Sequence, residues 1–191
     1  MTDDEFLVCA EADLVLSIDH ADDKYLGLPG CLVRMRMFDA EWQKRIGAEI
    51  GDRIVNIDID CVTTGPIDHL FDSEDEFTIM QGFNSTNPCP FNGSLWKFRA
   101  GERHDVWDDF GPEAHHRFNV PIHAIPDDQG WLHFKFPKAK AYTPQNGVYC
   151  FKKKTWTTGK VLPEGACVVA FPGRDPAKYQ ELDWVKANWK C

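Results

Sequence analysis

The stretch that most constrains the fold is residues 52–60, where an apolar run ends in two carboxylates separated by one residue. Residues 53–57 form a short run that is rich in β-branched side chains, a pattern typical of a strand buried on both faces of an α/β sheet. Because side chains alternate along a strand, Asp58 and Asp60 are expected to point the same way, with Ile59 directed into the core. The stretch predicts two like charges at the carboxyl end of a buried strand.

Two carboxylates that face the same volume repel each other, so a positive group is usually needed to hold them there. A hard divalent cation with oxygen ligands is the simplest such group. Ligands of open α/β sheets also collect at the carboxyl ends of strands. The alternative is a pair of solvated loop charges, since Asp-x-Asp tripeptides are frequent in acidic chains. The position of Asp58 and Asp60 directly after an apolar strand favours the cation site.

The size and charge of the chain narrow the class of protein. With 191 residues, the chain is long enough for one domain with a sizeable core and too short for two full α/β domains. We therefore expect one α/β domain over residues 1–191. The formal net charge of −9 and the lack of a basic stripe argue against general binding to nucleic acid. The one basic cluster, residues 152–154, suits a solvated turn.

Cysteine use and hydropathy bear on the compartment. The seven cysteines are scattered singly without a Cys-x-x-Cys pair, which is typical of free thiols in a reducing cytoplasm. No stretch has the length and apolarity of a transmembrane helix, and the acidic first residues do not suit a signal peptide. We expect a cytoplasmic protein without a transmembrane segment.

Local patterns predict strands and helices in alternation. Short strands are expected at residues 6–10, 77–80, 94–99, 147–151 and 166–171, and the alternation within 94–99 predicts one polar face. Residues 31–38 fit a strand by period and a helix by composition. Helices or helical turns are expected after Asp39, at residues 67–71 and 101–110, and after Asp175. An aspartate just before Trp131 suits a helix cap.

Six short motifs occur in an order that is similar to a known family. They are Leu-Pro-Gly-Cys-Leu-Val-Arg at 28–34, Asn-Ile-Asp-Ile-Asp-Cys-Val at 56–62, Phe-Asn-Gly-Ser-Leu-Trp at 91–96, Asp-Gln-Gly-Trp at 128–131, Phe-Lys-Lys at 151–153 and Val-Val-Ala-Phe-Pro-Gly-Arg at 168–174. The series resembles the small bacterial and phage glycosyltransferases of the GT-A fold, relatives of the glycogenin and lipopolysaccharide galactosyltransferase group. The resemblance covers residues 28–190.

This resemblance implies a Rossmann-like sheet flanked by helices that binds a nucleotide-diphosphate sugar through Mn²⁺ or Mg²⁺. The sugar would pass to a sugar, lipid or protein acceptor. Asp58 and Asp60 match the family's metal and nucleotide carboxylates, with Asp60 as the direct metal ligand and Asp58 also near the ribose. Arg34 matches a basic residue near the sugar diphosphate. An all-oxygen site suits these cations, which neutralise charge on the leaving phosphate.

The resemblance also assigns residues to the sugar side of the site. Asn92, Gly93 and Ser94 match the segment that lines the donor sugar and the acceptor. Asp128 and Gln129 match a pair that faces the donor sugar, and Asp128 is the stronger candidate for a catalytic or sugar-hydroxyl role.

The chain departs from the family pattern in two ways. Relatives usually carry a late Phe-His-Gly motif whose histidine completes the metal site, and this chain has Pro172 at that position. Relatives also carry a further strand and helix that hold the base and the ribose. Asp58 comes too early in this chain for that unit, which predicts that the first strand-helix unit is lacking.

Two alternative functions remain open. One is an inactive or truncated relative that binds a sugar nucleotide without turnover. The other is a phosphatase of the haloacid-dehalogenase type, in which the first aspartate of a motif like that at residues 58–62 is phosphorylated and the second is the acid/base. That class needs a later lysine motif and an acidic pair. Residues 127–128 resemble such a pair, but no convincing lysine motif precedes them.

Overall fold

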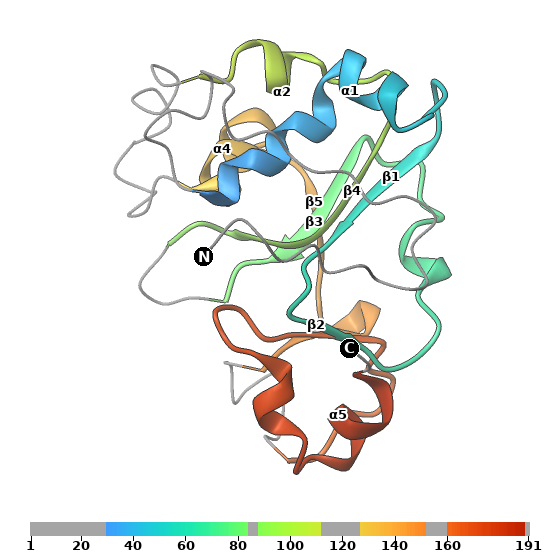
Figure 1. The fold of residues 1–191 in the computed structure, drawn as a ribbon, viewed down its shortest axis with the longest axis vertical. Coiled ribbons are helices and arrows are strands. Elements are labelled where there is room, and N and C mark those ends of the chain that lie inside the picture. Colours follow the sequence, from blue (N-terminus) through green and yellow to red (C-terminus); the bar gives the residue numbers. More distant parts are fainter. Residues whose placement is uncertain (1–29, 84–87, 112–126, 152–159, 190–191) are drawn as a thin grey trace.

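The computed structural model describes residues 30–83, 88–111, 127–151 and 160–189 (Figure 1). The strand expected at residues 6–10 and the basic cluster at 152–154 lie outside these ranges. Strands and short helices alternate along the chain and build two mixed sheets, so the predicted α/β class is confirmed. None of the described helices is long and apolar enough to cross a membrane.

The first sheet has four strands in the order β1-β4-β3-β5. These are β1 (Arg53–Ile57), β4 (Phe91–Arg99), β3 (Phe77–Gln81) and β5 (Lys140–Tyr142). Strand β4 pairs antiparallel with β1 and β3, and β5 runs parallel to β3. Strand β1 is therefore an edge strand, and Ile54 is its one buried residue. The prediction that this strand is buried on both faces was wrong, because an apolar run does not reveal a strand's place in the sheet.

Strand β4 lies at the centre of this sheet and is buried along most of its length. Every residue from 93 to 98 is buried, including Ser94 and Lys97. The Lys97 ammonium donates to the Ser73 carbonyl, so the polar residue on this face is covered by the segment before β3. The strand expected at residues 94–99 is confirmed, but its polar residue Lys97 is buried, because alternation alone does not tell which side of a strand is covered.

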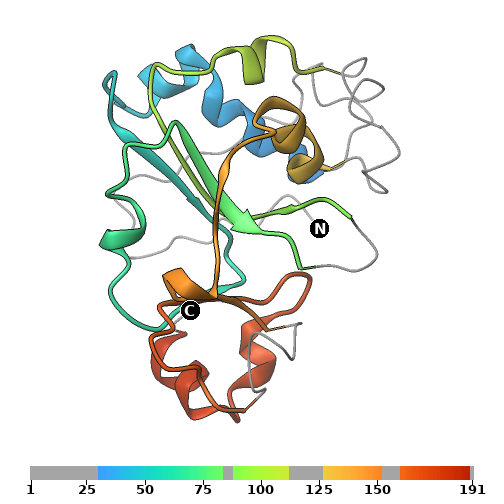
Figure 2. The ribbon, with the colours of Figure 1, turned by 180° about the vertical axis from the view of Figure 1, so that it is seen from behind.

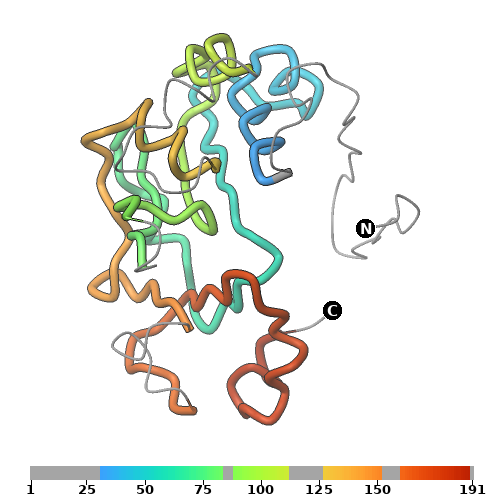
Figure 3. The backbone as a smooth tube through the Cα atoms, turned by 90° about the vertical axis from the view of Figure 1, so that its left-hand side faces the viewer, coloured from blue at the N-terminus to red at the C-terminus, as the bar shows by residue number. Residues whose placement is uncertain are grey.

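The second sheet is smaller, in the order β2-β7-β6. It comprises β2 (Cys61–Thr63), β7 (Val168–Ala170) and β6 (Val148–Cys150), with β2 antiparallel and β6 parallel to β7. Figures 1 and 2 show this sheet and α5 (Asp183–Asn188) below the first sheet. The chain crosses from one sheet to the other directly after β1, as Figure 3 shows. The predicted carboxylate pair lies at this crossing.

The helix η2 (Gly30–Phe38) resolves the strand-or-helix ambiguity of its sequence. It is a 3-10 helix, and its buried residues Leu32, Met35 and Phe38 recur every three residues. That spacing matches three residues per turn, so one stripe faces the core. Helix α1 (Ala40–Arg45) follows, and the Glu41 amide donates to Asp39 Oδ1 at 3.1 Å, which confirms the predicted N-cap.

The other helices within the described residues are short. They are η3 (Asp68–Leu70), α2 (Asp105–Asp108), α4 (Asp128–Lys135), η4 (Pro144–Asn146) and η5 (Pro176–Tyr179). The helix predicted over residues 101–110 is shorter than expected, because Gly101 and Arg103 have φ values of 83° and 54°. A right-handed helix cannot pass through such residues. The C-terminal helix predicted after Asp175 is divided into η5 and α5, and Asp175 caps η5.

An aromatic core joins these helices to the first sheet. The Phe38 ring of η2 stacks on Phe98 of β4 with centroids 4.1 Å apart, and Phe77 stacks on Phe136 at 4.0 Å. Trp96 contacts both groups of rings and is fully buried. This packing fixes η2 and α4 relative to β4, and the three elements form the walls of the site.

Candidate functional site

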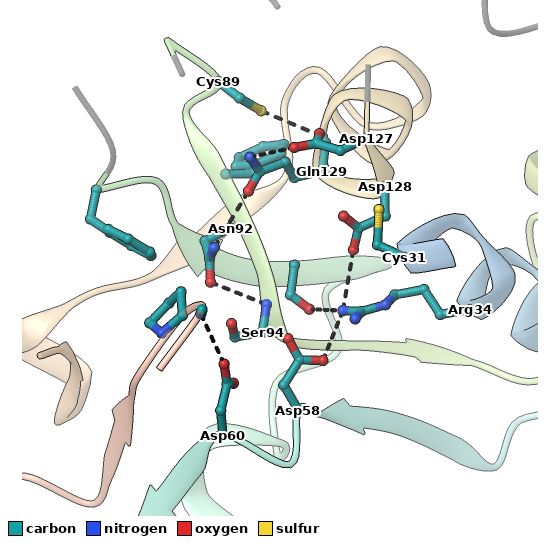
Figure 4. A pocket seen from close by; sticks show the side chains of 15 residues that line it. Cys31, Arg34, Asp58, Asp60, Cys89, Asn92, Ser94, Asp127, Asp128 and Gln129 are labelled. Carbon is teal, nitrogen blue, oxygen red and sulfur yellow. Dashed lines mark hydrogen bonds and ion pairs between the residues drawn. The ribbon is translucent and has the colours of Figure 1, made fainter. Parts of the chain in front are cut away.

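A cleft of about 350 Å³ lies where the ends of these elements meet (Figure 4). Its walls include all eight residues that the sequence predicted for a site: Arg34, Asp58, Asp60, Asn92, Gly93, Ser94, Asp128 and Gln129. The resemblance gave no site role to the other lining residues: Cys31, Phe83, Cys89, Phe91, Asp127, Pro172 and Gly173. Segments separated by more than 100 positions in the sequence thus form one cavity.

The carboxylate pair is presented by a turn rather than by a strand. Strand β1 ends at Ile57, and the Cys61 amide donates to the Asp58 carbonyl at 3.0 Å, which closes a tight turn before β2. Both carboxylates line the cleft, as predicted. Ile59 is 87% exposed, so the expectation that it points into the core was wrong. The turn breaks the strand alternation on which that expectation was based.

Arg34 is the positive group beside Asp58. Its Nη1 lies 2.8 Å from Asp58 Oδ1 and 3.2 Å from Asp128 Oδ2. The same nitrogen donates to the Gly93 carbonyl at 2.8 Å. Burial lowers the pKa of Arg34, but the Asp128 and Asp58 carboxylates raise it more, so the pKa lies above its ordinary value. The guanidinium is thus a fixed positive charge in the wall of the cleft.

Asp60 is less completely satisfied than Asp58. Its Oδ2 accepts from the Gly173 amide at 3.3 Å, while its Oδ1 is buried and has no hydrogen-bond partner. Burial, followed by the charge of Asp58, raises the pKa of Asp60. A buried carboxylate oxygen without a partner is costly, and a cation or a donor group that binds in the cleft would relieve that cost.

The chemistry of these residues fits a hard cation shared with a ligand. Asp58 and Asp60 are oxygen donors, and Mg²⁺ sites commonly combine one or two carboxylates with substrate phosphates. Among the residues that the structure describes, no group of three or more His, Cys, Asp or Glu is arranged to hold a metal by itself. Pro172 lies in the cleft wall, where it offers no side-chain ligand. A cation at this place would therefore draw further oxygen ligands from a bound molecule or water.

Two adjacent aspartates at the start of α4 have different roles: one caps the helix and the other faces the cleft. Asp127 is the N-cap, because its Oδ1 accepts from the Gly130 amide at 2.9 Å. Its Oδ2 accepts from Gln129 Nε2 at 2.9 Å. The capping role expected for an aspartate before Trp131 thus falls on Asp127. Asp128, the first residue of the helix, is left to face Arg34 in the cleft.

Asp128 has the most perturbed carboxyl group in the cleft. Burial raises its pKa to about 6, with the positive charge of Arg34 opposing the shift and the charges of Asp127 and Asp58 adding to it. Its Oδ2 lies within ion-pair distance of Arg34 but lacks hydrogen-bond geometry. A carboxyl group that titrates near pH 6 can both hold and accept a proton under physiological conditions.

The beginning of β4 provides the amide side of the cleft. Pairing with β3 jumps from Ile79–Trp96 to Met80–Asn92, so a bulge of three residues lies between Asn92 and Trp96. Bulges re-aim side chains and are frequent beside functional sites. Asn92 accepts from the Ser94 amide at 3.1 Å and donates to Gln129 Oε1 at 3.4 Å. These bonds link β4 to α4 across the cleft.

The two cleft cysteines do not have the properties of nucleophiles. Burial, with a smaller contribution from Asp128, raises the pKa of Cys31 to about 11. Burial raises the pKa of Cys89 to about 12. Because the thiolate is the reactive form, neither side chain is activated at neutral pH. The chemistry of the cleft therefore belongs to its carboxylates, its guanidinium and its amides.

Comparison of the chain with models of protein families found no match, and a search of curated proteins found no similar protein.

Proposed function

We propose that this protein is a metal-dependent glycosyltransferase with a GT-A-like fold that moves a sugar from a nucleotide-diphosphate donor to an acceptor. The observation that carries the proposal is the convergence of Asp58, Asp60, Arg34 and Asp128 on one cleft. A mixed α/β sheet with polar residues at its strand ends supports the same proposal. The motif series at residues 28–174 agrees with it in order and in residue type.

Asp58 and Asp60 are proposed to hold Mn²⁺ or Mg²⁺ together with the phosphates of the donor. The unpartnered Oδ1 of Asp60 supports a direct contact from this residue. A cation bound there neutralises the negative charge that develops on the leaving diphosphate. The Gly173 amide would keep the Asp60 carboxylate oriented through its bond to Oδ2.

Asp128, Gln129 and Asn92 are proposed to face the sugar. Sugar hydroxyls both donate and accept hydrogen bonds. A side-chain amide can pair with them in either role, because its oxygen accepts and its NH₂ group donates. The bonds from Asn92 to Gln129 and from Gln129 to Asp127 hold these amides in place before a ligand arrives. Asp128, with its pKa near 6, can accept or donate a hydrogen bond at a sugar hydroxyl.

The two alternatives make different demands on the cleft. A phosphatase of the haloacid-dehalogenase type requires a lysine, and Arg34 is the only basic side chain among the described residues that line the cleft. This observation favours the glycosyltransferase. A relative that binds nucleotide sugars without turnover would use the same contacts, and only a kinetic assay separates it from an enzyme.

The described cysteines also bear on where the protein works. Cys31, Cys61 and Cys167 are free thiols, of which Cys61 and Cys167 are buried. Free thiols are usual in a reducing compartment. We therefore propose that the protein functions in the cytoplasm.

Release of UDP or GDP from a panel of nucleotide sugars in the presence of Mn²⁺ tests the function. The wild-type protein is expected to turn over at least one donor, and Asp60→Asn should lower that rate by about 100-fold or more, because one metal ligand is lost. Asp72→Asn is the matched control: this aspartate is exposed and pairs with Arg53 at 3.4 Å, outside the cleft. Normal turnover by Asp60→Asn would exclude the proposed metal site. Donor binding without turnover in the wild type would favour the non-catalytic alternative.

A further inference from the structure

A single nitrogen of Arg34 contacts three other parts of the fold. Nη1 meets Asp58 Oδ1 from the β1–β2 turn, the Gly93 carbonyl from β4, and Asp128 Oδ2 from α4. Arg34 itself comes from η2, so four elements converge at one atom (Figure 4). Each partner is an oxygen that lines the cleft or belongs to a residue that lines it.

Gly93 leaves the space in which this convergence occurs. A Cβ placed on Gly93 would lie 2.2 Å from Asp128 Oδ2 and 3.0 Å from its Cγ. It would also lie 3.3 Å from Arg34 Nη1. The first of these distances is far inside van der Waals contact, so any larger residue would push the Asp128 carboxylate away from the guanidinium. Gly93 belongs to the bulge of β4, which brings its backbone close to α4.

From these contacts we infer that Arg34 is a positioning residue that keeps the Asp58 and Asp128 carboxylates facing one cleft, and that Gly93 is required because it leaves room for this arrangement. The inference rests on the proposed function, because it assigns roles within the same site. It goes beyond the family-based expectation, which places Arg34 near the donor diphosphate.

The electrostatics of the cleft explain why such a residue is needed. Asp58 and Asp128 carry like charges, and Asp128 is 6% exposed, so water does little to screen its carboxylate. Without a shared positive charge the two groups would repel each other, and Asp128 would be an unpaired buried charge. A guanidinium suits this task because it presents several donors in a fixed plane, whereas an ammonium is a single mobile point charge.

The first test measures the coupling between Arg34 and Asp128 without any ligand. Urea unfolding at pH 8 compares wild type, Arg34→Gln, Asp128→Asn and the double variant. Arg34→Gln should destabilise the wild type much more than it destabilises Asp128→Asn, with a difference of about tenfold in the unfolding equilibrium constant. Arg34→Met, which also removes the positive charge, replaces Arg34→Gln in the cycle if the latter does not fold. A difference below about twofold would overturn the positioning role.

The second test perturbs the arrangement without removing a polar side chain. Gly93→Ala should lower donor turnover by about tenfold or more, because it displaces the Asp128 carboxylate. Gly65→Ala is the matched control, since a Cβ at Gly65 would have its nearest neighbour at 3.6 Å, an ordinary contact. The double variant Arg34→Gln/Gly93→Ala should be no slower than the slower single variant. Arg34→Lys should retain part of the turnover.

The two hypotheses fail in different ways. If wild type neither binds nor turns over any nucleotide sugar, the proposed function is wrong, and the urea cycle still decides whether Arg34 and Asp128 are coupled. If wild type is active but Gly93→Ala behaves like Gly65→Ala, the positioning role is overturned. Effects of Arg34→Gln and Gly93→Ala that multiply would likewise favour direct contact of Arg34 with the diphosphate.

Discussion

The two ends of β4 are built in opposite ways. Toward its carboxyl end, Trp96 and Phe98 pack against the rings of Phe38 and Phe77, and all four side chains are buried. Toward its amino end, residues 93–95 bulge away from β3, and residues 91–94 border a cleft that contains four carboxylates and one guanidinium. One end buries apolar surface, which stabilises the fold, and the other gathers charges that repel each other.

This difference separates the source of stability from the source of function. Burial of apolar surface is non-directional and depends mainly on shape and volume, so the core end gains free energy where its rings fit together. The cleft end leaves Asp60 Oδ1 and Asp128 Oδ2 buried without hydrogen bonds, at a cost to stability. Perturbed and incompletely paired groups of this kind cluster at functional sites. The comparison predicts that substitutions at one end change mainly stability and those at the other mainly binding.

The largest expected effect on stability is in the aromatic core. Phe98→Ala should lower the free energy of unfolding by about 4 kcal/mol, because a fully buried ring is replaced by a cavity. Donor affinity of the remaining folded protein should be unchanged. Phe134→Ala is the control, since Phe134 is 46% exposed and its removal should cost less than about 1 kcal/mol. Urea unfolding measures both. Loss of donor affinity in folded Phe98→Ala would break the separation of the two ends.

A smaller effect, dependent on pH, is expected for Asp128. Its pKa of about 6 lies above the ordinary value of 3.8, so the folded protein binds the extra proton between these values. Wild-type stability contributed by this group is therefore present at low pH and lost as pH rises through about 6. Relative to Asp128→Asn, the wild type should lose up to about 3 kcal/mol between pH 4 and pH 7. Urea titrations at several pH values measure this difference.

Asp105 provides a control of opposite sign. The hydrogen bond from Arg103 is the main cause that lowers the pKa of Asp105 to about 2. Stability from this ion pair is therefore present above the ordinary aspartate pKa and lost as the pH falls toward 2. The wild type should become less stable relative to Asp105→Asn on acidification. The same direction of change for Asp105 and Asp128 would contradict the contrast between the cleft and the surface ion pairs.

The smallest effect is expected at the helix caps, where the two regions should behave alike. Asp127 caps α4 in the cleft and Asp39 caps α1 outside it. Replacing either residue by alanine should cost about 1 kcal/mol in thermal or urea unfolding. A much larger cost for Asp127→Ala would mean that the cleft depends on Asp127 for more than the start of the helix. Donor binding should respond to Asp127→Ala alone, because only this residue lines the cleft.

From the sequence, the residues that line the cleft could be predicted better than the contacts they make. Asp58 and Asp60 stand out because a carboxylate pair follows an apolar strand, and the motif series added Arg34 and Asp128. Contacts that join distant segments left no local signal: the Gly173 amide reaches Asp60 only because β2 pairs with β7. The orientation of Ile59 was mispredicted because a turn replaces the strand there.

The fold was predictable where a local period was strong. Strands β3, β6 and β7 follow clear apolar runs, and the cap at Asp39 has its expected partner. Strand β5 was not predicted, because three residues are too few for a period to register. The 3-10 helix η2 remained ambiguous because its period of three lies between those of a strand and an α-helix. Tertiary packing determined the secondary structure of both segments.

Calorimetric binding of UDP and GDP, each with and without Mn²⁺, to wild type and Asp60→Asn is the decisive measurement for a metal-assisted nucleotide site in the cleft. We expect one nucleotide to bind wild type in a Mn²⁺-dependent manner and this dependence to be lost in Asp60→Asn. Asp72→Asn should bind like wild type. Absence of binding for both nucleotides, or equal Mn²⁺-dependent binding by Asp60→Asn, would contradict a metal-assisted nucleotide-sugar site at Asp58 and Asp60.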